Sequence, residues 1–375
     1  MIVRKASKTA GQLRIGKDAF IAVMLTCAII SGLTADAAAL QNRSLRQAKE
    51  AMEKADRYMG DWQGSWTLDD GYDSGPLVAQ VIALGKGQYR ANFNYEFEYE
   101  WPALFVLEGK LEGSAPQFNG RAEFGHVIDI ESSIKADKFA GKFKGTSADG
   151  EGISGTFTME KTIRLSPTLG KKPPEGAIVL FAGEREDTDN WQAARRRIAG
   201  FPWLLKDAAM EVRPRAGGII TKQKFGDCKL HIEFRSPFMP DARGQGRGNS
   251  GVYLQGRYEV QILDSYGLQG MDNECGGIYR VGRPLVNMCA PPTQWQTYDI
   301  TFRAPRFDAN GEKKELATLT VVHNGITTQN GVQAKGPTTA APAPTEKGPG
   351  GLYLQDHGNP VQFRNIWLVK LPRED

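Results

Sequence analysis

The sequence has little of several residue types on which common kinds of site depend. Its 375 residues include only four histidines and four cysteines, and no Cys-x-x-Cys pair. Structural zinc sites gather Cys and His ligands at short spacing, so a zinc-stabilised fold is not expected. After the N-terminus no apolar run is long enough to cross a bilayer. The mature chain is therefore expected to have no membrane span.

The sequence also has little net charge once its N-terminus is set apart. Residues 1–39 hold five basic and two acidic residues, a net of +3, so the formal +4 of the whole chain falls to about +1 in the remainder. Tight nucleic-acid binding depends on neutralising many phosphates. The composition therefore predicts a protein that does not bind nucleic acid.

The N-terminus has the pattern of a secretory signal. Basic residues precede the apolar segment Phe20–Leu33, and small residues follow at Ala35, Ala37 and Ala39. This order predicts a signal peptide over residues 1–39 and a periplasmic or extracellular protein; an uncleaved membrane anchor is the alternative.

Export would permit a disulfide. Cys275 and Cys289, which flank a loop-like stretch, are the best pair for one, with free thiols as the alternative. Cys228 would then be a buried thiol.

The rest of the chain reads as strands rather than helices. Residues 40–60 predict a helix or linker, and residues 61–165 contain short strands separated by glycine turns, which is typical of an antiparallel meander or small barrel. Residues 166–176 form a Pro/Gly/Lys linker. Residues 177–372 again contain strands without helical periodicity, which predicts a β-sandwich. The Pro/Thr/Ala-rich stretch 327–350 is expected to be a flexible surface loop.

One segment, RGNSGVYLQGRYEVQILDSYG, combines strand alternation with unusual polar chemistry. A three-residue loop centred on Gly256 would place Leu254 opposite Tyr258 and put both apolar rows on one face. Tyr253, Glu259 and Gln261 would then share the other face. A solvated outer face is the alternative interpretation.

The alternation breaks after Ile262, because Leu263 stands where a polar residue is expected. A β-bulge near Ile262–Leu263 would shift the phase and return Asp264 to the face of Glu259. Polar and aromatic neighbours suited to sugars surround these acids, namely Asn249, Tyr253, Arg257 and Tyr266.

Two resemblances follow from these motifs. YEVQILD is similar to the Glu-x-Asp-x-x-Glu strand of jelly-roll β-glucanases, but Gln261 replaces the middle acid, so retaining hydrolysis by that pattern is in doubt. A longer resemblance, over residues 177–372, is to the 3-keto-disaccharide hydrolase domain family. It is carried by VLFAGEREDTDNW, GNSGVYLQGRYEVQILDSYG, CGGIYRVGRPLVNMCAPPTQWQTYDITFRAP and GGLYLQDHGNPVQFRNIWL.

The resemblance implies that residues 177–372 form a concanavalin A-like jelly-roll sandwich. With the smaller antiparallel β domain that the strand pattern predicts before it, and which lies outside the resemblance, the expected fold class is all-β. It also implies an enzyme that cleaves 3-keto-glycosides. The ketone acidifies the C2 proton, a base removes it, the C1 oxygen leaves, and water can add back. A divalent cation or hydrogen-bond donors would stabilise the enolate; no organic cofactor is expected.

The predicted catalytic residues are Glu259, Asp264 and His357, which are also the candidate ligands of a metal ion. The predicted substrate-binding residues are Asn249, Tyr253, Arg257, Gln261, Tyr279, Gln355 and Arg364, with a structural ion pair as the alternative for Arg364. His126 and His231 are interpreted as structural, and His323 as exposed scaffold. The competing function is that of a non-catalytic, lectin-like carbohydrate-binding protein, because this kind of sandwich serves both roles.

Overall fold

A computed structural model describes residues 35–98, 102–194 and 200–372. The predicted signal peptide falls almost entirely on residues 1–34, outside the described residues. Helix α2 (Ala35–Ala55) covers much of the segment that was expected to be a helix or linker. None of the helices in the described part of the chain has the length and apolar character that a bilayer crossing requires.

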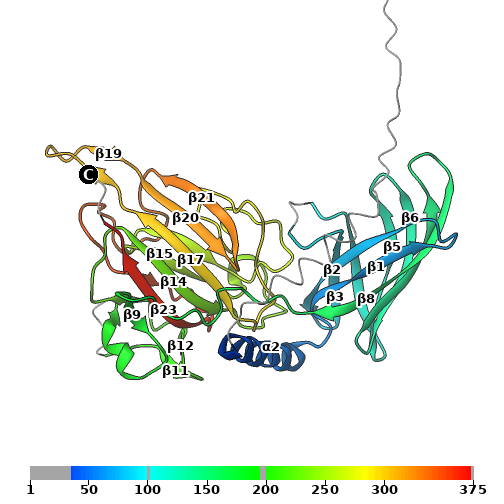
Figure 1. Ribbon diagram of the computed structural model, residues 1–375, viewed down its shortest axis with the longest axis horizontal. Coiled ribbons are helices and arrows are strands. Elements are labelled where there is room, and N and C mark those ends of the chain that lie inside the picture. The colour runs from blue at the N-terminus through cyan, green and yellow to red at the C-terminus, as the bar shows by residue number, and fades with distance from the viewer. Residues whose placement is uncertain (1–34, 99–101, 195–199, 373–375) are drawn as a thin grey trace, which may run out of the picture. The chain divides into compact units, whose positions relative to one another are not determined.

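The first set of strands closes into an antiparallel barrel in which each strand pairs with its neighbours in sequence and β1 pairs with β8 (Figure 1). The predicted small barrel is therefore confirmed. Large side chains fill its interior, with Trp62, Phe118 and Phe139 all fully buried. The strands are β1 (Gly60–Leu68), β2 (Ser74–Gly85), β3 (Gln88–Asn94), β4 (Phe105–Glu112), β5 (Ala115–Glu123), β6 (Val127–Lys135), β7 (Lys138–Thr146) and β8 (Gly152–Thr162).

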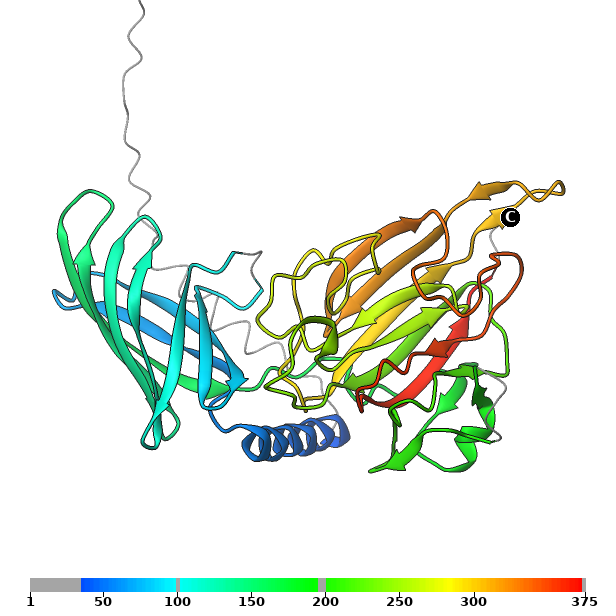
Figure 2. The same cartoon turned by 180° about the vertical axis from the view of Figure 1, so that it is seen from behind.

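The second set of strands forms a sandwich of two main sheets, seen from behind in Figure 2. The larger sheet has the order β11-β12-β23-β14-β17-β20-β21 with β9 beside β23, and the smaller has the order β10-β13-β22-β15-β16. The predicted all-β class is confirmed. The larger sheet contains β9 (Ile178–Phe181), β11 (Leu204–Lys206), β12 (Ala209–Glu211), β14 (Cys228–Arg235), β17 (Gln296–Arg303), β20 (Ala317–His323), β21 (Ile326–Ala334) and β23 (Gln362–Lys370).

The smaller sheet contains β10 (Trp191–Ala193), β13 (Ile219–Thr221), β15 (Ser250–Leu254), β16 (Tyr258–Ile262) and β22 (Tyr353–Leu354), while β18 (Arg306–Phe307) and β19 (Lys313–Glu315) form a short hairpin. Single 3₁₀ turns occur at η1 (Glu186–Asn190) and η2 (Gly244–Gly246). The two main sheets pack through apolar side chains, for example the rings of Tyr258 and Phe302, whose centroids lie 5.5 Å apart.

The predicted linker lies on the outer face of the larger sheet. Ser166 shares a hydrogen bond with Thr297 at 2.6 Å, and the backbone N–H of Gly170 donates to Glu233 at 2.5 Å. Pro and Gly allow the chain to leave the regular strands here, but polar side chains of β14 and β17 hold it in place.

The cysteines and His323 are buried in ways that differ from the sequence-based expectations. Cys228, Cys275 and Cys289 are all buried free thiols, so the expected disulfide is not formed; the Cys275 thiol instead hydrogen-bonds with the Tyr298 hydroxyl at 3.2 Å. His323, expected to be exposed, is fully buried, and its Nε2 lies 2.9 Å from Oε1 of Gln296. Burial lowers the pKa of His323 to about 3.

Candidate functional site

The hairpin β15–β16 has the register that its alternation predicts. Leu254 lies opposite Tyr258, and Tyr253 lies opposite Glu259. The loop that fixes this register bends at Gln255 and Gly256, which have φ angles of 55° and 65°. Glycine adopts such a conformation without steric cost, so Gly256 suits this turn, whereas Gln255 adopts it with some strain.

The two faces of the hairpin carry the predicted side chains. Val252, Val260 and Ile262 point into the sandwich core and are fully buried. Because side chains alternate along a strand, Glu259 and Gln261 share the opposite face. Both are also buried, with exposed fractions of 3% and 1%. This face is therefore not the solvated surface that was the alternative interpretation.

The Glu259 carboxyl lies beside the Tyr253 hydroxyl, to which it is hydrogen-bonded. Gly251 makes room for this pair, since a Cβ atom there would stand 2.2 Å from Oε1 of Glu259 and 2.9 Å from the Tyr253 ring. Burial raises the pKa of Glu259 to about 8, and the hydrogen bond from Tyr253 only partly opposes that rise. Burial and the negative charge of Glu259 also raise the pKa of Tyr253. The pair can thus hold or pass a proton near neutral pH.

The stretch 327–350 does not form the expected flexible loop: residues 327–334 belong to β21, and residues 335–350 cover this pair. The Thr338 N–H donates to the Arg257 carbonyl at 2.8 Å, and the Thr338 hydroxyl accepts from the Glu259 N–H at 3.0 Å. The next carbonyl, of Thr339, lies 3.4 Å from the Tyr253 hydroxyl. The segment is held because its backbone groups pair with the hairpin, and it contributes to the burial that shifts the pKa of Glu259.

Amide side chains gather further along the same face. The Asn249 and Gln261 amide groups both donate to Oε1 of Gln245, at 3.0 and 3.1 Å. Oδ1 of Asn249 and Oε1 of Gln261 are buried and have no hydrogen-bond partner among the described residues. Unpaired buried acceptors are costly, so they indicate a missing partner with hydrogen-bond donors, such as a water or a ligand.

The segment 355–359 runs beside these residues. The Gln355 amide donates to the Tyr253 hydroxyl at 3.0 Å, and its backbone N–H donates to the Gly251 carbonyl at 3.0 Å. Oδ1 of Asn359 accepts from the Asn249 N–H at 2.8 Å. His357 lies between these anchor points with its side chain exposed. Gln355 therefore reaches the Glu259 pair directly, whereas His357 stands on the exposed part of the same segment.

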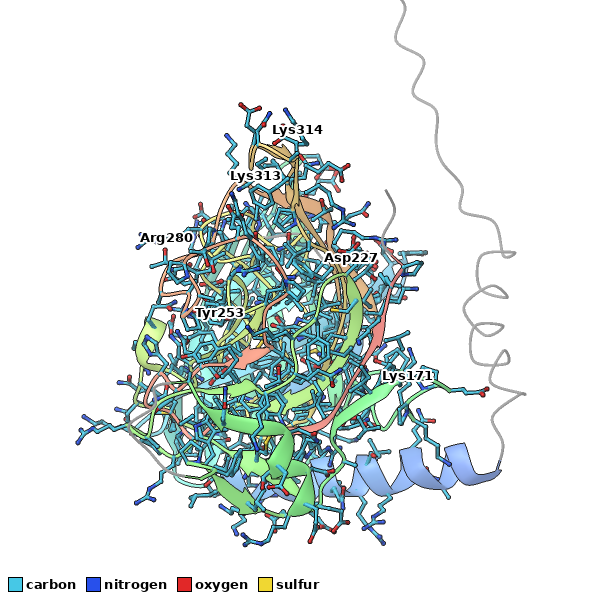
Figure 3. The ribbon with its side chains drawn as sticks, turned by 90° about the vertical axis from the view of Figure 1, so that its left-hand side faces the viewer. Lys171, Asp227, Tyr253, Arg280, Lys313 and Lys314 are labelled. Atoms are coloured by element: carbon cyan, nitrogen blue, oxygen red, sulfur yellow. The ribbon has the colours of Figure 1, made fainter. Side chains whose placement is uncertain are left out.

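Tyr279 also lies at this site. Its backbone N–H donates to the Glu259 carbonyl at 3.2 Å, and its half-buried phenol is close enough to Tyr253 to raise the pKa of that residue. Arg280 lies over the Tyr279 ring, 5.8 Å from its centroid. Figure 3 shows Tyr253 deep among the side chains and Arg280 at the outer edge.

The predicted bulge is wrong, and Asp264 does not lie beside Glu259. The pairing of β15 with β16 runs without a shift to Ser250 opposite Ile262, where the strand ends. Asp264 turns into the interior and accepts a hydrogen bond from Arg247 Nε at 2.6 Å. Complete burial raises the pKa of Asp264, while the Arg247 charge opposes the rise. The chain needed no bulge because a loop, rather than a continuing strand, carries Asp264.

The two arginines predicted to bind substrate are engaged elsewhere. Nη1 and Nη2 of Arg257 donate to the carbonyls of Gly348 and Lys347, at 2.8 and 3.2 Å, and so anchor the covering segment. Arg364 lies on the outer face of the larger sheet, where its Nε donates to Glu233 at 2.7 Å. Arg364 therefore forms a structural ion pair, which was the alternative interpretation of this residue. It cannot reach the hairpin site because its strand, β23, belongs to the other sheet.

The predicted metal ligands do not converge. Asp264 pairs with Arg247, Glu259 with Tyr253, and His357 is exposed. Across the described ranges, no three His, Cys, Asp or Glu side chains lie close enough together to hold a metal ion. The set of Glu259, Asp264 and His357 therefore does not fit a bound cation.

Some residues of the site had no signal in the sequence. Gln245 precedes the hairpin by several residues, and Thr338 lies in the low-complexity stretch. Both join the site through loop conformations, which residue alternation does not predict. The glycine at position 251 was visible in the motif, but its role depends on the Glu259 side chain that fills the space beside it.

Comparison with known proteins identifies the family to which the chain is similar. The profile of the family described as 3-keto-alpha-glucoside-1,2-lyase-like domain matches residues 176–369. A crystal structure of a proposed glycosyl hydrolase from Parabacteroides distasonis ATCC 8503 is 38% identical, over 53% of this chain and 85% of that chain, with a TM-score of 0.47. A second proposed glycosyl hydrolase of that organism is 16% identical, over 53% of this chain and 95% of that one, with a TM-score of 0.38. No curated protein matches the chain.

Proposed function

Because the chain belongs to the 3-keto-alpha-glucoside-1,2-lyase-like domain family, we propose that it cleaves glycosides whose sugar carries a ketone at C3, with Glu259 as the base. The observation that carries this proposal is the buried Glu259 carboxyl, whose pKa is raised to about 8 and which lies beside Tyr253. A carboxyl with that pKa can accept a proton from carbon and pass it on within one catalytic cycle.

The reaction follows from the acidity of the C2 proton next to the ketone. The Glu259 carboxylate takes this proton, and the electron pair of the C–H bond moves toward the C3 carbonyl to form an enolate. When the enolate collapses, the bond from C1 to the glycosidic oxygen breaks. The leaving oxygen then takes a proton from the Tyr253 hydroxyl or from protonated Glu259. Addition of water to the resulting unsaturated ketone would complete a net hydrolysis.

The amide side chains support a role in holding the sugar. The unpaired acceptors Oδ1 of Asn249 and Oε1 of Gln261 suit sugar hydroxyl groups, which donate hydrogen bonds. The Gln355 amide, already bonded to Tyr253, can donate to a sugar oxygen with its second N–H. These contacts would serve a purely carbohydrate-binding protein equally well, so the Glu259 chemistry distinguishes the two functions.

Export remains a proposal that rests on the residues of positions 1–39 alone. The basic start, apolar segment and small residues near Ala37 support it. Mass spectrometry of the protein secreted by its own host would show whether the mature chain begins near Ala39.

The proposed function predicts exchange at C2. When a 3-keto-glucoside is incubated with the protein in D₂O, we expect aglycone release and deuterium at C2 of the hydrated sugar product. The unsaturated ketone formed first has no hydrogen at C2, and the proton that Glu259 removed goes to the leaving oxygen or exchanges with solvent before water adds. The matching unoxidised glucoside should bind without turnover. Release of product that retains its original C2 hydrogen would contradict the elimination route, and binding of both sugars without product would favour the lectin-like function. A parallel assay with a chelator would show whether a cation is needed.

The pKa of Glu259 predicts the pH dependence of the reaction. Because the base must be ionised, kcat/KM should fall about tenfold per pH unit below about pH 8 and level off above it. In the Tyr253→Phe variant this limb should move to higher pH, since the lost hydrogen bond had lowered the pKa of Glu259. The measurement is a rate profile between about pH 6 and about pH 10. A flat profile, or one that falls with rising pH, would exclude Glu259 as the base.

A further inference from the structure

A cavity at one end of the barrel β1–β8 shares no lining residue with the site described above. Its volume is about 150 Å³, and it is lined mainly by aromatic and branched apolar side chains, among them Trp66, Phe105, Phe124 and Phe143. Trp66, Phe105 and Phe143 point inward because side chains alternate along each strand, and Phe124 follows directly after the end of β5. The barrel interior elsewhere is filled by large rings such as Phe118 and Phe139. The interior of an eight-stranded barrel either is filled by side chains or holds one small ligand. In this barrel large rings fill one part of the interior, and a cavity the size of a small ligand remains at one end.

The size and lining of the cavity select a single aromatic ring. A dry apolar cavity of about 150 Å³ accommodates one benzene-sized molecule. Two rings of the lining are already stacked, Phe105 on Phe124 with 5.3 Å between centroids, and Phe105 also stacks on Phe93 behind it at 4.5 Å. Aromatic pairs gain energy beyond the burial of their area, so a further ring in this space would be favoured over an aliphatic group of equal size.

One buried nitrogen atom at the cavity has no hydrogen-bond partner among the described residues. Nδ1 of His126 is shielded from solvent and has no hydrogen-bond partner within the part of the chain that the structure describes. The other ionisable groups of the lining, Asp73 and Tyr95, are both exposed, and the Asp73 carboxyl accepts from the Ser74 N–H at 2.9 Å. His126 was interpreted as structural; the residue is half-buried, but a ring nitrogen that is shielded from solvent is normally hydrogen-bonded. A ligand with one hydroxyl group would supply the missing partner.

We propose that the barrel binds one small phenol, with its ring among Trp66, Phe105 and Phe124 and its hydroxyl donating to Nδ1 of His126. An apolar cavity with a single placed polar group is the usual form of a small-molecule site. The proposal concerns the barrel by itself and holds whether or not the sandwich cleaves 3-keto-glycosides.

The test is calorimetric titration of the full chain with 4-methylphenol and with toluene, which differ by one hydroxyl. We expect both to bind one-to-one, with 4-methylphenol about fivefold tighter, the value of one net hydrogen bond. His126→Phe keeps a ring and removes the acceptor, so it should abolish the difference and leave toluene binding unchanged. Equal affinities in the unaltered protein would overturn the role of His126.

A second variant tests the cavity itself. Ile153→Phe adds bulk inside the lining and should weaken both ligands by about tenfold or more, because it fills the space that the ring needs. Val106→Phe is the matched control, since Val106 is 38% exposed on the outer face of β4 and should have no effect. Circular dichroism melting shows that each variant is folded, and Ile128→Phe replaces Ile153→Phe if that variant is not. Absence of saturable 4-methylphenol binding, or unchanged binding in a folded, filled variant, would overturn the proposal.

Discussion

Glu259→Gln is expected to lower kcat/KM on a 3-keto-glucoside by about 10²- to 10⁴-fold, the usual contribution of a positioned general base. Glutamine has nearly the same shape but cannot take a proton from carbon. Its neutral amide also spares the protein the burial of a charge, so the fold should keep its stability. The measurement is steady-state kinetics at a pH above about 8, where unaltered Glu259 is ionised.

A matched control exists on the other sheet. Glu233 is also a buried glutamate, but it pairs with Arg364 on the outer face of the larger sheet. Glu233→Gln should therefore lower stability and leave kcat/KM of the folded protein unchanged. If Glu259→Gln retained full turnover, or if the two variants lost activity equally, the base would have to be sought elsewhere.

The second large effect is expected on stability. Asp264→Asn should lower the free energy of unfolding by about 3–5 kcal/mol, because it leaves the Arg247 guanidinium buried without its counter-charge. Arg247 has a side-chain exposure of only 8%, so water cannot replace the lost partner. Chemical denaturation followed by circular dichroism measures the change.

The double variant Arg247→Met with Asp264→Asn should recover part of the loss, since neither charge then remains buried. The exposed pair Lys142 and Glu131 provides the comparison: Glu131→Gln should leave stability unchanged, because solvent screens that pair. Turnover per folded molecule should survive Asp264→Asn. A folded Asp264→Asn protein of normal stability but without activity would return Asp264 to the catalytic role that its position in the motif had suggested.

Local alternation predicted the part of the site that lies within regular strands. The pairs Leu254–Tyr258 and Tyr253–Glu259 follow from a period of two and one tight turn, and the structure has both. The predicted position of Asp264 was wrong because the prediction extended the strand past Ile262, where the chain already enters a loop. Once pairing stops, the direction of a side chain depends on what it can bind, and a buried carboxylate binds the nearest guanidinium.

Arg364 and His357 also show that a local sequence pattern does not predict contacts between distant segments. Both stand in the closing motif of the chain with Gln355, yet Gln355 reaches Tyr253, Arg364 joins the opposite sheet, and His357 is exposed. Closeness in sequence did not mean closeness in space, because the chain crosses from one sheet to the other between Leu354 and Gln362.

The amino-acid sequence by itself determined the two β units, the hairpin register and the polar face that carries Glu259, because these depend on residue periodicity and turn chemistry. Only the tertiary structure decided which acid stands beside which partner, that a low-complexity segment covers Glu259, and that a cavity remains in the barrel. Those outcomes depend on burial and on competition for hydrogen bonds between distant segments, and such competition has no local pattern in the chain.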